Sequence, residues 1–136
     1  MDDDVTAPVP TALRVAAVVV ACEGLGAAVF GIVEALNTHS SRAVMGVTTS
    51  LFFVVYGAGL LVCARGLSRA QSWGRGPVLI SQLIALGLAW NFRSGGTWPI
   101  SVLLAVPAVA VLVAMLHPTT LAALDGPPLD VGDDRD

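Results

Sequence analysis

The chain has 136 residues, of which 55% are apolar and only 12% are charged. Its length suits a single domain, and soluble domains carry about 25% charged residues, twice what this chain offers to water. The formal net charge is −3 and all seven basic residues are arginines, so no Lys/Arg stripe is available to neutralise a phosphate backbone. The composition therefore excludes an ordinary soluble domain, argues against nucleic-acid binding and indicates an integral membrane protein.

Four apolar stretches are candidate membrane-spanning helices, because about 20 apolar residues cross a hydrocarbon core about 30 Å thick. They cover about residues 11–36, 43–64, 76–92 and 98–116. None has the charged outer face that a helix of a soluble bundle needs. The connections are short, which makes consecutive spans antiparallel neighbours. The predicted fold is all-α, a four-helix transmembrane bundle of two antiparallel hairpins.

Arginines near the span ends predict the orientation. Arg14 lies at the start of the first span and three arginines crowd the loop 65–75, whereas the other two loops hold one each. The positive-inside rule then places this loop and both termini in the cytoplasm, for a multi-pass protein of the plasma membrane. Residues 1–10 and 117–136 are rich in Asp, Pro and Gly, which predicts a disordered acidic N-terminus and an acidic tail around the membrane domain, residues 11–116.

Glu23 is the acid nearest the middle of a span, and an ionisable residue at membrane depth is by default a candidate functional site. Glu34 follows eleven residues later, and the same separation joins Gln82 to Arg93 in the third span. Eleven residues are three helical turns plus about 20°, so each pair shares one face. We expect Gln82 to hydrogen-bond Glu23 or a backbone carbonyl, and Glu34 to pair with Arg93 at the outer surface.

Small residues recur at helix-packing spacing in the first two spans. In lipid, such residues let two helix backbones approach closely. The predicted packing positions are Gly24, Ala28, Gly31, Gly46, Ser50 and Gly57.

The loop between the second and third spans combines Arg65, Arg69 and Arg75 with Trp73. Basic and aromatic residues at this level either anchor the topology or dock anionic lipid head groups or the acidic loop of a partner. Both interpretations stay open.

No residues point to enzymatic chemistry. His39 and His117 have no carboxylate or cysteine at metal-ligand spacing, and both cysteines fall in apolar runs. Phosphate-binding glycine loops, nucleophile elbows and zinc-protease motifs do not occur in the sequence. We therefore expect no enzyme, no metal and no cofactor.

From Trp73 onward the chain reads WGRGPVLISQLIALGLAWNF and then SVLLAVPAVAVLVAMLHPTTLAAL. This half resembles the second half of small four-span integral membrane proteins of high-GC actinobacteria, and the Ala- and Val-rich, all-Arg composition suits that source. The resemblance covers the last two spans and implies membrane location and architecture, without an activity.

A second resemblance is to the small multidrug-resistance transporters, four-span proteins with an essential Glu in the first span. Glu23, followed by Gly26 in EGLG, occupies the matching place. The chain departs from that family in its second span, which has no internal Pro, in the absence of a Lys closing the first span, and in the aromatic pattern of the third.

Two functions follow as hypotheses. The first is an accessory or interaction subunit of a larger membrane assembly, suggested by small-residue faces, short loops and the lack of a catalytic cluster. The alternative is a proton-coupled small transporter that uses Glu23, as a homo-oligomer because four helices enclose little cavity alone. The expected partners are the lipid bilayer and either another membrane protein or further copies of the chain.

Overall fold

The computed structural model describes residues 8–125, and the disorder predicted for residues 1–7 and 126–136 lies outside this range. The described part is helical throughout, with no strand. Its α-helices are α1 (Thr11–Asn37), α2 (Ala43–Ser68), α3 (Arg75–Asn91), α4 (Trp98–Leu116) and α5 (Pro118–Asp125). Short 3-10 turns join the first four: η1 (Ser40–Arg42), η2 (Ser72–Gly74) and η3 (Gly95–Thr97).

Three of these helices are long and apolar enough to cross a membrane: α1, α2 with η1, and α4 with η3. The fourth candidate, α3, has 17 residues. At 1.5 Å per residue it is about 26 Å long, somewhat shorter than a hydrocarbon core of about 30 Å. The structure thus describes a membrane protein with three spanning-length helices and one shorter apolar helix.

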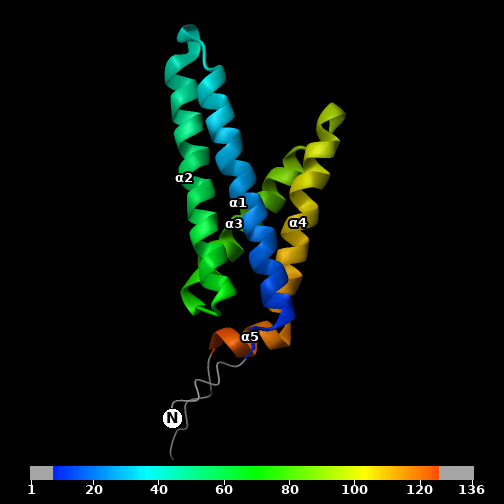
Figure 1. The fold of residues 1–136 in the computed structure, drawn as a ribbon. Coiled ribbons are helices and arrows are strands. Elements are labelled where there is room, and N and C mark those ends of the chain that lie inside the picture. The colour runs from blue at the N-terminus through cyan, green and yellow to red at the C-terminus, as the bar shows by residue number, and fades with distance from the viewer. Residues whose placement is uncertain (1–7, 126–136) are drawn as a thin grey trace, which may run out of the picture.

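The helices associate in two pairs, α1 with α2 and α3 with α4, which diverge from a common base (Figure 1). Towards the base α1 also packs on α4. We call the base, with η2 and α5, the packed end of the molecule. The opposite end, where η1 and η3 lie at the tips of the diverging pairs, is the open end (Figure 1).

Small residues explain why α1 and α2 lie so close together. A Cβ added to Gly24 would stand 2.8 Å from the carbonyl oxygen of Gly57, and one added to Gly31 would stand 2.8 Å from that of Ser50. Ala28 in turn touches the Gly57 position. The remaining predicted packing residue, Gly46, lies against Thr38 just beyond α1. The structure places all six predicted packing residues along this seam, where larger side chains would push the backbones apart.

The second pair is joined differently. Ser101 Oγ donates a hydrogen bond of 2.6 Å to the carbonyl oxygen of Ala89, linking α4 to α3. Pro107 lies inside α4, where it removes one backbone donor from the helical ladder.

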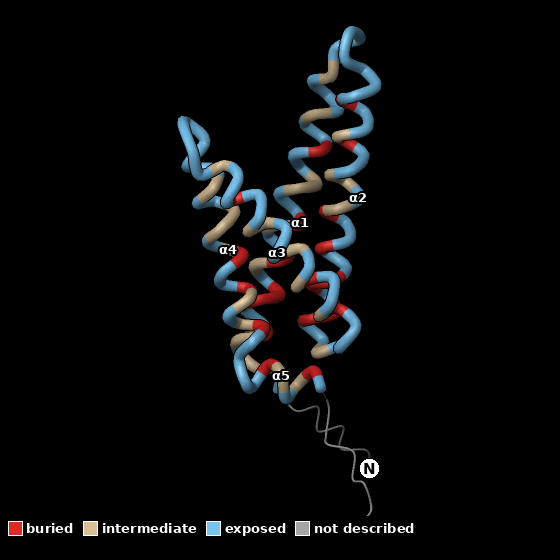
Figure 2. Tube along the Cα trace, turned by 180° about the vertical axis from the view of Figure 1, so that it is seen from behind, coloured by how far each residue is buried: buried red, intermediate tan, exposed pale blue. Residues whose placement is uncertain are grey.

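Most of the buried residues lie in the half of the molecule nearer the packed end, as Figure 2 shows. Leu13, Val20, Leu67, Val111 and Met115 are each fully buried there. Leu124 of α5 completes this core from below. Apolar side chains nearer the open end are mostly exposed, so one cluster at the base holds the two helix pairs together.

Residues 118–125, which the sequence analysis assigned to the acidic tail, form a helix. Pro118 occupies the first position of α5, where its missing N–H costs nothing. Thr120 and Leu124 are buried, and the Asp125 carboxylate forms an ion pair of 3.0 Å with the Arg75 guanidinium. Burial of one face stabilises a helix too short to persist alone.

Candidate functional site

Glu23 lies about midway along α1, one position before the glycine that packs on α2. Because Gly24 faces α2, its neighbour Glu23 is directed to a different side of α1, towards α3. The side chain is half-buried. Glu23 lies three residues after Val20, the last buried residue that α1 contributes to the core cluster.

Gln82 of α3 is the partner of Glu23. Its Nε2 donates a hydrogen bond of 2.8 Å to Glu23 Oε2, and the residue is only 1% exposed. The structure therefore brings together two of the four residues expected in the intramembrane polar site. Their bond joins α1 to α3, two helices with few other contacts.

The Glu23–Gln82 site has more acceptors than donors. Gln82 Oε1 is buried and has no hydrogen-bond partner among the described residues. Within the same range no cation pairs with the Glu23 carboxyl, so an amide is its polar partner. A buried polar atom left without a partner costs about 1–3 kcal/mol.

An amide can hydrogen-bond a carboxyl group in either of its protonation states. With Glu23 ionised, the amide N–H donates to the carboxylate, as in the observed contact. With Glu23 protonated, its O–H can donate to the amide oxygen once the Gln82 amide turns by half a rotation. The same two side chains thus suit either a fixed helix contact or a group that exchanges a proton.

Glu34 and Arg93 do not form the expected pair: the ion pair found within residues 8–125 is that of Arg75 with Asp125. The two helix pairs diverge towards the open end, which separates the C-terminal end of α1 from that of α3 (Figure 1). Arg93 instead lies over the ring of Trp90, with its guanidinium carbon 3.8 Å from the ring centroid. Its charge is stabilised locally by a cation–π contact.

The arginines of the loop 65–75 have two different environments. Arg75 pairs with Asp125, while Arg65 and Arg69 are exposed. Trp73 packs over Gly66, and its indole N–H donates a 2.9 Å hydrogen bond to Gln71 Oε1. This arrangement leaves two exposed arginines at the packed end.

Two features were missed from the sequence. Asp125 was assigned to the tail, although the three-residue spacing of Leu121 and Leu124 just before it could have indicated the apolar face of a short helix. Arg42 and His39 line a pocket together with Glu34, which the linear distance between charged residues does not reveal.

The histidines, cysteines and acids of residues 8–125 are dispersed over the structure. In residues 8–125 no three His, Cys, Asp or Glu side chains are grouped so as to hold a metal ion. Cys22 and Cys63 are both free, the first exposed and the second buried.

Comparison with protein-family models, with curated proteins and with solved structures gave no match to this chain. Any function must therefore be argued from the geometry above.

Proposed function

We propose that the protein is a multi-pass component of the plasma membrane that acts as an accessory or interaction subunit of a larger membrane assembly. In this proposal all four of α1–α4 cross the bilayer as two antiparallel hairpins, and both termini are cytoplasmic. The shortness of α3 is compatible with crossing, because a bilayer thins locally around a short span at modest cost.

The observation that carries the proposal is a set of glycines on exposed apolar faces. A Cβ added to Gly59 of α2 or to Gly87 of α3 would meet nothing within 4 Å. The neighbours of Gly59 are exposed apolar residues such as Val55 and Val62, and Gly87 adjoins Leu83. Unlike Gly24 and Gly57, these glycines are not used within the chain. In lipid they offer sites where a helix of another protein can approach closely.

The test is gentle extraction of the tagged protein from its native membrane, followed by mass measurement of the intact assembly. The proposal expects a complex that includes a larger, different subunit. Gly59→Leu or Gly87→Leu should release that subunit, whereas Ala110→Leu, which adds nearly as many atoms at an exposed position of α4, should not. Recovery of this chain alone from the native membrane would contradict the proposal.

A proton-coupled small transporter is the second candidate, and the Glu23–Gln82 hydrogen bond favours it. Intramembrane acids mark proton pathways in transporters, and Gln82 suits both protonation states of the carboxyl. This candidate predicts that purified wild-type protein releases protons when an organic cation binds and that Glu23→Gln abolishes the release. No proton release with any of a panel of lipophilic cations would exclude it.

A further inference from the structure

A polar pocket lies at the open end, between the end of α1, the turn η1 and the start of α2. Its volume is about 400 Å³, within the range of small-ligand sites. Three of its lining residues carry ionisable groups, the Glu34 carboxyl, the His39 imidazole and the Arg42 guanidinium. An acid and a base therefore share one pocket.

The two opposite charges line this pocket without pairing with each other. Neither Glu34 nor Arg42 takes part in an ion pair within the described part of the chain. Neighbouring polar groups are satisfied locally: Asn37 Nδ2 donates to the carbonyl oxygen of Val33 at 2.8 Å, and Thr38 Oγ1 donates to that of Glu34 at 2.7 Å. The Glu34 carboxyl and the Arg42 guanidinium thus remain available to a ligand.

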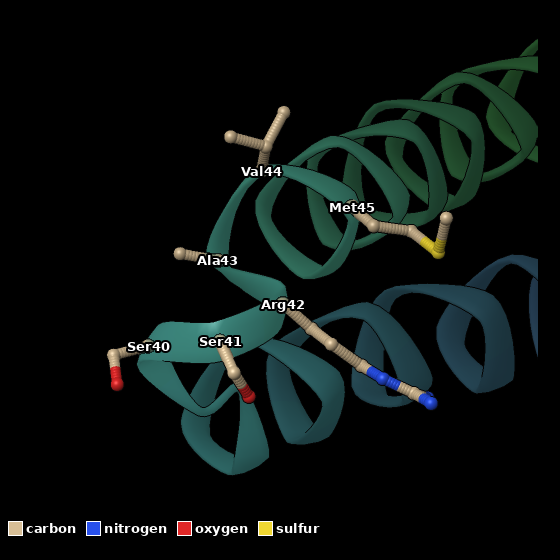
Figure 3. A pocket seen from close by; sticks show the side chains of 6 residues that line it. All are labelled: Ser40, Ser41, Arg42, Ala43, Val44 and Met45. Carbon is tan, nitrogen blue, oxygen red and sulfur yellow. The ribbon is translucent and has the colours of Figure 1, made fainter.

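A second hollow of about 500 Å³ covers the turn itself and shares Ser41, Arg42 and Met45 with the first. Figure 3 shows the Arg42 side chain extending from the turn over α1, away from Ser40 and Val44, with Met45 on the same side. Arg42 lines the first pocket together with Glu34 of α1.

The pocket lies at head-group depth if α1 spans the membrane as proposed. With 27 residues, α1 is about 40 Å long and exceeds the hydrocarbon core by about 10 Å. Beside the pocket, Val44 and Met45 are 84% and 72% exposed. A ligand in the pocket would thus have a polar site for its head and an apolar surface beside it.

We propose that this pocket binds the head group of a zwitterionic aminophospholipid, with the ammonium at Glu34 and the phosphate at Arg42. A guanidinium binds phosphate oxygens through paired N–H donors, and a primary ammonium donates hydrogen bonds to a carboxylate. The acyl chains lie along Met45, which lines the same pocket. A choline head group has no N–H to donate to Glu34, and a glycerol head group brings no cation, so both bind less well.

The test is native mass spectrometry of the purified, delipidated full-length protein, with phosphatidylethanolamine, phosphatidylcholine or phosphatidylglycerol added in turn. Wild-type protein should retain phosphatidylethanolamine about fivefold more than either other lipid, the ratio expected from one partly exposed charge pair. Glu34→Gln should reduce this retention to the phosphatidylcholine level. Arg42→Gln should lower the retention of all three lipids, and Arg42→Lys should recover part of it.

Arg93→Gln, at the tip of the other helix pair, is the matched control and should leave the lipid preference unchanged. Far-ultraviolet circular dichroism of each variant separates loss of binding from loss of helix. Equal retention of the three lipids by folded wild-type protein would overturn the proposal. Free phosphoethanolamine that displaces the lipid at equal concentration would also overturn it, since the pocket would then serve a soluble amphoteric compound.

Discussion

The packed and open ends of the molecule differ in the contacts that hold their helices together. At the packed end all five α-helices contribute buried side chains to one core, among them Leu13, Leu67 and Met115. At the open end each helix lies only against the other helix of its pair (Figure 1), and apolar residues such as Leu36 and Leu103 are exposed. The Glu23–Gln82 bond lies between these regions. The chain therefore forms a buried core of its own at the packed end, whereas the apolar surface at the open end is available to lipid or to a partner.

The largest loss of stability is expected from a large side chain placed in the seam between α1 and α2, which runs through both regions. Gly57→Leu should lower the free energy of unfolding by about 3 kcal/mol, because its side chain would collide with the Gly24 and Ala28 backbone. Gly59→Leu, two residues away and facing open space, should change it by less than about 0.5 kcal/mol. Reversible unfolding in mixed detergent micelles measures both. Equal losses would contradict the close approach of α1 and α2.

A second pair of substitutions compares the two ends directly. Met115 is fully buried at the packed end, while Leu103 on the same helix is 74% exposed. Met115→Ala should cost about 2 kcal/mol through the cavity it leaves, and Leu103→Ala less than about 0.5 kcal/mol. The same unfolding assay applies. A larger loss at Leu103 in the isolated protein would reverse the assignment of the two ends.

The contact between α1 and α3 is tested by a double-mutant cycle of Glu23→Ala and Gln82→Leu, each of which removes one partner of the hydrogen bond. The two side chains should be coupled by about 0.6 to 1 kcal/mol, as is usual for hydrogen bonds within membranes. Pairing Gln82→Leu with Glu34→Gln, which is distant from it, is the control and should give additive losses. Additivity in the Glu23 cycle as well would show that the 2.8 Å contact contributes nothing to stability.

The smallest effect is expected for the ion pair that ties α5 to α3. Arg75 and Asp125 are 3.0 Å apart, but their side chains are 32% and 64% exposed, so solvent screens the attraction. Arg75→Gln should cost less than about 0.5 kcal/mol, and raising the salt concentration should abolish the difference. A loss above 1 kcal/mol that persists in high salt would show that α5 depends on this charge pair more than on buried Leu124.

The sequence allowed the helices and their closest seam to be predicted for definite physical reasons. Apolar runs between short polar connections placed the four long helices to within a few residues of their observed ends, such as Thr11 and Leu116. The small residues Gly24 and Gly57 predicted close packing of the first two helices, and in the structure these two residues touch. A hydrogen bond from Gln82 to Glu23 was one of two expected alternatives, the other being a bond to a backbone carbonyl, and the structure shows the first.

The divergence of the helix pairs was not predictable in the same way. It depends on crossing angles set by the whole core, which no local pattern encodes. Parallel pairs would have brought Glu34 to Arg93, whereas the observed divergence leaves Arg93 on Trp90. The folding of α5 has a similar origin, since Leu124 becomes buried only when α1 and α4 already form a base.

The measurement that most directly tests the membrane architecture is labelling of single cysteines from either side of the native membrane. With Cys22 and Cys63 replaced by Ala, new cysteines would be placed in η1, η2 and η3, as Ser41→Cys, Ser72→Cys and Ser94→Cys. A membrane-impermeant maleimide should reach Ser72→Cys only from the cytoplasmic side and the other two only from outside. Labelling of Ser72→Cys and Ser94→Cys from the same side would show that α3 does not cross, and would contradict the four-span architecture.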